Sequence, residues 1–146
     1  MDKKTYLFGW IIPALIIVVN AMAIMIRWES LPETLLTHFD SEGYASGSMP
    51  RGALIFYPVV SAIICVIFYA VGYWISKRSK NNYKANKLRF TGLIFLASGI
   101  TLTIFSSTMV TLTQGTMPGF MFAEPVIIVI ALIASIICLV KARKCK

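Results

Sequence analysis

Four uncharged, largely apolar stretches dominate the chain, at 5–26, 52–76, 90–123 and 125–140. They are continuous rather than alternating, and lipid offers the backbone no hydrogen-bond partners, so each stretch must be helical rather than a barrel strand. One span takes about 20 residues, so the third stretch, 34 residues long, must contain a span and a turn. The pattern therefore predicts four transmembrane helices, at about 6–26, 53–75, 91–113 and 120–140.

The composition excludes most soluble proteins. Hydrophobic residues make up 58% of the chain and charged residues only 14%, whereas soluble domains carry about 45–50% apolar and about 25% charged residues. This excess cannot be buried in one small soluble core, so a soluble enzyme is nearly excluded. We expect an all-α integral membrane protein in which residues 1–146 form a single membrane domain.

The cations are distributed unevenly. Of the 14 Lys and Arg residues, 12 precede the first helix, lie in the connection 76–90 or end the chain, and only Arg27 and Arg51 lie in the loop 27–52. The positive-inside rule then predicts that both termini are cytoplasmic and that the loop 27–52 is extracytoplasmic, as in a multi-pass protein of the cell membrane. Anionic lipid at the membrane surface is the expected partner of the basic connection. Nucleic acid is not expected, since only Tyr83 could stack there.

The first apolar stretch has an alternative interpretation. Lys3 and Lys4, an apolar run and then Ala21-Met22-Ala23 have the outline of a cleavable signal peptide. The apolar run continues through Ile26, as a retained membrane anchor requires, and this continuation favours an uncleaved helix.

Polar and small residues within the stretches predict how the helices pack. Asn20 should face another helix and form an interhelical hydrogen bond, because an unsatisfied amide in hydrocarbon is costly. Glu124 is expected in the first turn of the fourth helix, and we consider a pairing with Arg27 or Arg51. Small residues recur every seven positions in the third helix, which permits close approach of a neighbouring helix. They are Gly92, Gly99, Ser106 and Thr113.

The loop 27–52 is too long to be a simple turn. Ser30 followed by Glu33 forms a capping-box pattern, which predicts a short helix over Leu31–Leu36. The next four residues should be extended, and 40–43 matches a type I turn. Gly47 offers a second reversal of the chain. We therefore expect an ordered loop.

The same loop carries Leu-Pro at 31–32, Thr-His-Phe at 37–39 and glycines at 43 and 47. This layout resembles the hallmark of a bacterial membrane domain of unknown function that also occurs at the N-terminus of SdpI-type toxin-immunity proteins. The resemblance implies a bacterial cytoplasmic-membrane protein with an immunity or signalling role, whose loop recognises a ligand or peptide and whose partner is an extracellular peptide or another membrane protein. The loop-motif residues are Leu31, Pro32, Thr37, His38, Phe39, Asp40, Gly43, Gly47 and Arg51.

Chemistry in the loop centres on the only histidine. His38 lies near Asp40 and Glu42, and these three residues could ligate a divalent metal, although the spacing matches no established motif. No Ser or Cys nucleophile paired with a base is evident, so we favour a non-enzymatic protein without a cofactor, in which His38 supports the loop through a hydrogen bond. The alternative is a small transporter subunit or an extracytoplasmic metal-dependent membrane enzyme that uses His38.

Overall fold

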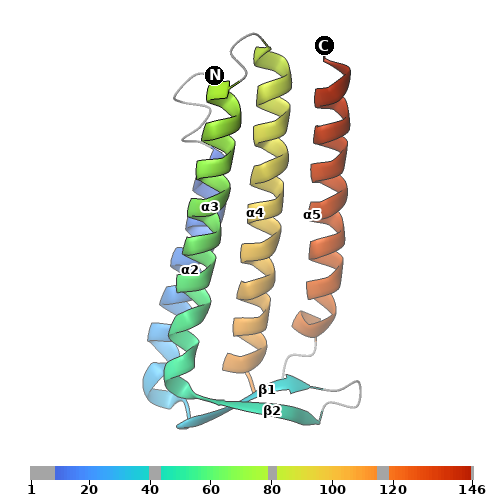
Figure 1. The fold of residues 1–146 in the computed structure, drawn as a ribbon. Coiled ribbons are helices and arrows are strands. Elements are labelled where there is room, and N and C mark those ends of the chain that lie inside the picture. Colours follow the sequence, from blue (N-terminus) through green and yellow to red (C-terminus); the bar gives the residue numbers. More distant parts are fainter. Residues whose placement is uncertain (1–8, 40–43, 79–81, 115–118, 146) are drawn as a thin grey trace.

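Four long helices form the body of the protein in the computed structural model (Figure 1), which describes residues 9–39, 44–78, 82–114 and 119–145. Each helix region is long and apolar enough to cross a membrane, so the described residues contain four candidate spans, as many as the sequence predicts. The helices are α2 (Ile11–Arg27), α3 (Phe56–Arg78), α4 (Tyr83–Leu112) and α5 (Gly119–Lys144).

Helix α4 is the central element of the bundle. It packs against α2, α3 and α5, whereas α5 packs mainly against α4. A Cβ atom built on Gly99 of α4 would overlap the Cβ of Ala131 in α5, and one built on Gly92 would lie 3.3 Å from the Cβ of Cys138. The two glycines of the predicted small-residue seam therefore lie at the α4–α5 contact, and at Gly99 the two helices approach so closely that an added Cβ would overlap its neighbour.

Helix α4 begins at Tyr83, well before the apolar stretch that marks its span. The side-chain oxygen of Asn82 accepts a hydrogen bond from the backbone N–H of Ala85 at 3.1 Å and so caps the first turn. The Asn82 side-chain amide also donates to the backbone carbonyl of Cys145, just after α5. Asn82 thus starts one helix and ties it to the end of its neighbour.

A β-hairpin lies across one end of the bundle, opposite the end at which the carboxyl terminus of α5 lies (Figure 1). We call the end that carries the hairpin the hairpin end. Strand β1 (Thr34–Phe39) pairs antiparallel with β2 (Ala45–Pro50). Two short 3-10 helices, η1 (Trp28–Ser30) and η2 (Arg51–Ile55), join the hairpin to α2 and α3. The predicted ordered loop therefore has the structure of a strand pair.

Two expectations for this loop are wrong. Residues 31–36 are not helical, because Thr34 begins β1 and the Ser30 hydroxyl donates backward to the Arg27 carbonyl at 2.8 Å. Gly47 is not a reversal, because it lies within β2 opposite Thr37. The predicted turn at 40–43 lies outside the described residues.

The hairpin is anchored by one of its leucines. Leu35 is completely buried, whereas its neighbour Leu36 is 41% exposed, as expected for successive residues on opposite faces of a strand. Full burial of a leucine contributes about 1.5–3 kcal/mol, which here favours the strand over the helix predicted from the capping box. Leu35 packs in a buried cluster with Ile24, Leu31, Leu54 and Leu112.

Candidate functional site

Arg51 connects the segments that enter and leave the hairpin. Its Nη1 atom donates to the carbonyl of Leu31 at 3.1 Å and to that of Trp28 at 3.3 Å. The guanidinium lies 5.1 Å from the centroid of the Trp28 ring, within the range of a cation–π contact. The backbone N–H of Arg51 also donates to the Glu33 carbonyl at 2.7 Å. One residue therefore holds η1, the start of β1 and the end of β2 together.

Gln114 connects the hairpin to the end of α4. Its Oε1 accepts a hydrogen bond from the backbone N–H of Leu36 at 3.2 Å, and its Nε2 donates to the Thr111 carbonyl at 2.6 Å. Gln114 adopts a φ of 51°, a left-handed conformation that residues other than glycine rarely adopt. Gln114 thus combines a left-handed backbone at the end of α4 with a side-chain hydrogen bond to Leu36 in β1.

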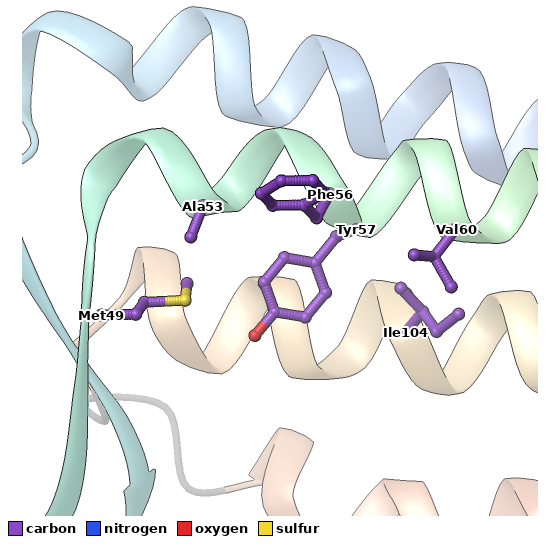
Figure 2. Close-up of a pocket in the computed structure, with 6 residues that line it drawn as sticks. All are labelled: Met49, Ala53, Phe56, Tyr57, Val60 and Ile104. Atoms are coloured by element: carbon purple, nitrogen blue, oxygen red, sulfur yellow. The ribbon is translucent and has the colours of Figure 1, made fainter.

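An apolar groove of about 400 Å³ lies beside the hairpin (Figure 2). Met49 of β2 and Tyr57 of α3 line the groove and also pack against the buried cluster around Leu35, described above. Val60 lies four residues after the start of α3, so the groove extends about 6 Å along that helix. It therefore occupies the first turns of the span, next to the hairpin. Its lining consists of Met49, Ala53, Phe56, Tyr57, Val60 and Ile104.

Five of the loop-motif residues take defined positions in the hairpin or in the segments that connect it to the helices. Leu31 and Thr37 are buried, whereas Pro32 is exposed. Gly47 pairs with Thr37 across the hairpin, and Arg51 makes the contacts described above. Thr37 and Gly47 therefore belong to the hairpin, and Leu31 and Arg51 attach it to the helices.

The remaining motif residues are not placed in detail. His38 and Phe39 belong to β1, but their side chains, together with Asp40, Glu42 and Gly43, lie outside the described part of the chain. Among the described residues, no group of three His, Cys, Asp or Glu side chains could hold a metal ion. The metal site considered for His38, Asp40 and Glu42 stays a prediction.

Glu124 does not pair with an arginine as considered from the sequence. It lies five residues after the start of α5, beyond the first turn, and its Oε1 accepts a hydrogen bond from the Ser107 hydroxyl at 2.7 Å. Arg51 is engaged by Trp28 and two carbonyls. The acid therefore joins α4 to α5 near the hairpin end.

Asn20 is buried between helices but lacks the expected interhelical bond. Its side chain is 1% exposed, and neither amide atom has a hydrogen-bond partner among the described residues. The hydroxyl of Ser61 in α3 is likewise buried without a partner there. Each such group carries a desolvation cost of about 1–3 kcal/mol.

Sequence reasoning missed Gln114 and the groove. The dipeptide Gln114-Gly115 indicated only a break after the third helix, and its partner Leu36 is distant in sequence. The groove combines residues of β2, η2, α3 and α4, and no local pattern marks such a set.

Comparison of the chain with protein-family models, curated proteins and solved structures finds no match.

Proposed function

We propose that this chain is a non-enzymatic protein of the bacterial cytoplasmic membrane whose hairpin end faces outward and recognises an amphipathic peptide, in an immunity or signalling role like that of SdpI-type proteins. The four candidate spans support a multi-pass membrane protein. The loop resemblance favours the immunity role among the functions open to such a protein.

The distribution of cations supports the proposed orientation. Basic residues lie at the start of α4 and in the last turns of α5, at the end of the bundle opposite to the hairpin end (Figure 1). Because cytoplasmic segments carry the excess of Lys and Arg, this end faces the cytoplasm. The basic residues are Lys84, Lys87, Arg89, Lys141, Arg143 and Lys144.

The observation that carries the proposal is an anchored hairpin beside an apolar groove. Arg51, Gln114 and buried Leu35 hold the hairpin to the helices, so little conformational entropy is lost there when a ligand binds. The groove begins where the span begins and is lined by apolar side chains and one tyrosine. A peptide that lies at the membrane surface could insert an apolar side chain into it.

Filling the groove tests this function. Ala53 lines the groove, whereas Ala70 is an exposed residue of the same helical region. We would express the wild type, Ala53→Trp and Ala70→Trp in a sensitive bacterium and challenge the cells with membrane-active amphipathic peptides. The wild type and Ala70→Trp should raise the lethal peptide concentration, whereas Ala53→Trp should not. Equal protection by the two variants, or no protection by the wild type against any peptide, would count against the proposal.

A separate measurement tests the metal-dependent alternative. A recognition protein in which His38 supports the loop should purify without stoichiometric zinc, and His38→Gln should not change its metal content. Stoichiometric zinc that His38→Gln releases would favour the membrane enzyme, because neutral imidazole is a good zinc ligand and a glutamine amide is a poor one.

A further inference from the structure

We propose that the groove beside the hairpin accepts a tryptophan side chain of the recognised peptide, and that the Tyr57 hydroxyl accepts a hydrogen bond from its indole N–H. This inference rests on the proposed function and specifies which side chain the groove selects. Three properties of the groove support it: a hydroxyl without a partner among the described residues, a lining of aromatic and thioether groups, and a position at the start of a span.

The Tyr57 hydroxyl is the only oxygen or nitrogen among the described side chains that line the groove. No described residue forms a hydrogen bond with it. In Figure 2 the Tyr57 ring lies between the side chains of Met49 and Ile104, with the hydroxyl at the end of the ring far from α3. The groove therefore offers one hydrogen-bonding group in otherwise apolar surroundings.

This hydroxyl selects against an occupant made only of hydrocarbon. A lipid acyl chain or a leucine side chain would displace water from the Tyr57 hydroxyl without replacing its hydrogen bond. A polar group that loses its partner on burial raises the free energy of the complex. An occupant that brings one donor avoids this penalty. The groove therefore favours a side chain with a large apolar body and a single polar atom.

Tryptophan matches this description best among the natural side chains. Its only polar atom is the indole Nε1, which donates one hydrogen bond and accepts none, so one bond to Tyr57 satisfies it. A tyrosine hydroxyl both donates and accepts and would need a further partner in an apolar lining. A phenylalanine side chain brings no donor, and a lysine or arginine side chain would bring a charge.

The rest of the lining suits an aromatic ring. Phe56 lines the groove and is 67% exposed, so its ring is available to a ligand. Aromatic pairs pack edge-to-face or offset, with a gain beyond the area that they bury. Met49 adds a thioether, and thioether sulfur makes favourable contacts with the edges of aromatic rings. An indole would therefore gain contacts that an aliphatic side chain lacks.

The position of the groove along the membrane agrees with this choice. The groove lies in the first turns of the candidate span Arg51–Ile75, next to the hairpin. Tryptophan is enriched at the membrane–water interface, where its apolar ring and its polar N–H are both accommodated. A peptide that lies at the membrane surface can therefore present a tryptophan at the depth of the groove.

The test uses a synthetic amphipathic helix of leucine and lysine with one tryptophan at the centre of its apolar face. A second peptide replaces this tryptophan with benzothienylalanine, an isostere in which sulfur takes the place of the indole N–H. The full-length protein is placed in phosphatidylcholine nanodiscs, and binding to nanodiscs without protein is subtracted, because both peptides partition into lipid.

Binding of both peptides is measured for the wild type, Tyr57→Phe and Tyr73→Phe. Tyr57→Phe keeps the ring that packs against the buried cluster and removes only the hydroxyl. Tyr73 is an exposed tyrosine farther along α3, outside the described lining of the groove, so Tyr73→Phe is the matched control.

The wild type and Tyr73→Phe should bind the tryptophan peptide about fivefold more tightly than its isostere, the equivalent of one neutral hydrogen bond. Tyr57→Phe should bind the two peptides equally. Equal binding of the two peptides by the wild type would overturn the inference, and so would a preference retained in Tyr57→Phe. If Ala53→Trp then still lost binding of both peptides, the groove would remain the recognition site and the proposed function would stand.

The comparison of the two peptides on the wild type does not depend on the folding of any variant. A third peptide with leucine at the same position tests a hydrocarbon occupant, and it should bind the wild type more weakly than the tryptophan peptide. Tighter binding of the leucine peptide would overturn the inference. No binding of the tryptophan peptide to the wild type would also overturn it, while the cell-challenge experiment decides the function separately.

Discussion

The side-chain oxygen of Gln114 accepts a hydrogen bond from the backbone N–H of Leu36 at 3.2 Å. The two residues come from opposite halves of the chain, one after α4 and the other within β1. Because Gln114 also donates to Thr111, its position is fixed from the helix side. The bond therefore fixes the position of the hairpin relative to the end of α4.

Gln114→Gly should loosen the hairpin without greatly changing the overall stability. The variant loses a hydrogen bond worth about 1 kcal/mol but relieves the left-handed conformation, which costs a non-glycine residue about 1–2 kcal/mol. Amide hydrogen exchange at Leu36 should accelerate, whereas the melting temperature should change little. The exchange at Leu102, within α4, serves as the internal control. Unchanged exchange at Leu36 would show that the hairpin is held by other contacts alone.

Arg51→Lys should destabilise the hairpin end by about 1–2 kcal/mol, even though the charge is retained. Lysine lacks the planar guanidinium that stacks on Trp28 while donating to two carbonyls. Faster hydrogen exchange in β1 and a lower melting temperature in detergent would report the loss. Arg27→Lys, at an exposed position, is the matched control and should behave like the wild type. If Arg51→Lys matched Arg27→Lys in hydrogen exchange and melting temperature, Arg51 would act only through its charge.

Gly99→Ala should destabilise the α4–α5 contact, because the added Cβ would overlap the Cβ of Ala131. Overpacking of this kind costs about 1–3 kcal/mol. The double variant Gly99→Ala with Ala131→Gly moves the methyl group to the facing helix and should recover most of the loss. Gly52→Ala, where a Cβ would meet nothing within 4 Å, is the control. Thermal stability in detergent is measured for the wild type and the three variants. If the double variant were no more stable than Gly99→Ala, the loss of stability would not come from the overlap with Ala131.

Asn20→Leu should stabilise the protein by about 1–3 kcal/mol, because it replaces a buried amide that has no hydrogen-bond partner among the described residues with an apolar side chain of similar size. Thermal unfolding in detergent measures the change, and Ala23→Leu, a half-buried position one turn later, controls for added apolar volume. A loss of stability in Asn20→Leu would show that the amide has a partner such as bound water.

Labelling from outside intact cells should reach the hairpin end and not the opposite end. Tyr44→Cys is at an exposed position beside β2, and Lys141→Cys is exposed in the last turns of α5. Both are made in a background where Cys65, Cys138 and Cys145 are replaced by alanine. A membrane-impermeant maleimide should label Tyr44→Cys in intact cells and Lys141→Cys only after lysis. The reverse result would invert the proposed orientation.

The helices could be predicted from the sequence because their signal is local. A long uncharged apolar run requires a helix in lipid whatever surrounds it, and glycines seven residues apart mark a packing face without knowledge of the partner. The predicted helix ends were less accurate, since α4 starts at Tyr83, directly after the capping residue Asn82, with basic residues inside its first turns. Hydropathy locates the span within a helix, and the capping residue sets where the helix starts.

The hairpin could not be predicted because its decisive contacts are distant in sequence. Locally, Ser30 and Glu33 resemble a helix start, and only the burial of Leu35 under α2 and α4 residues selects the strand. The bond from Leu36 to Gln114 and the groove from Met49 to Ile104 likewise join separate parts of the chain. Periodicity within one segment carries no information about such partners.

The packing of α5 mainly against α4 has a mechanical consequence. In lipid, no hydrophobic effect holds two helices together, so α5 is retained by close packing at Gly92 and Gly99 and by polar bonds near its two ends, from Asn82 to Cys145 and from Ser107 to Glu124. A force applied at the carboxyl end would load the Asn82 bond first, then the glycine contacts, and Ser107 last. Helix α5 would detach as one unit while the hairpin and its groove stayed assembled on the other three helices.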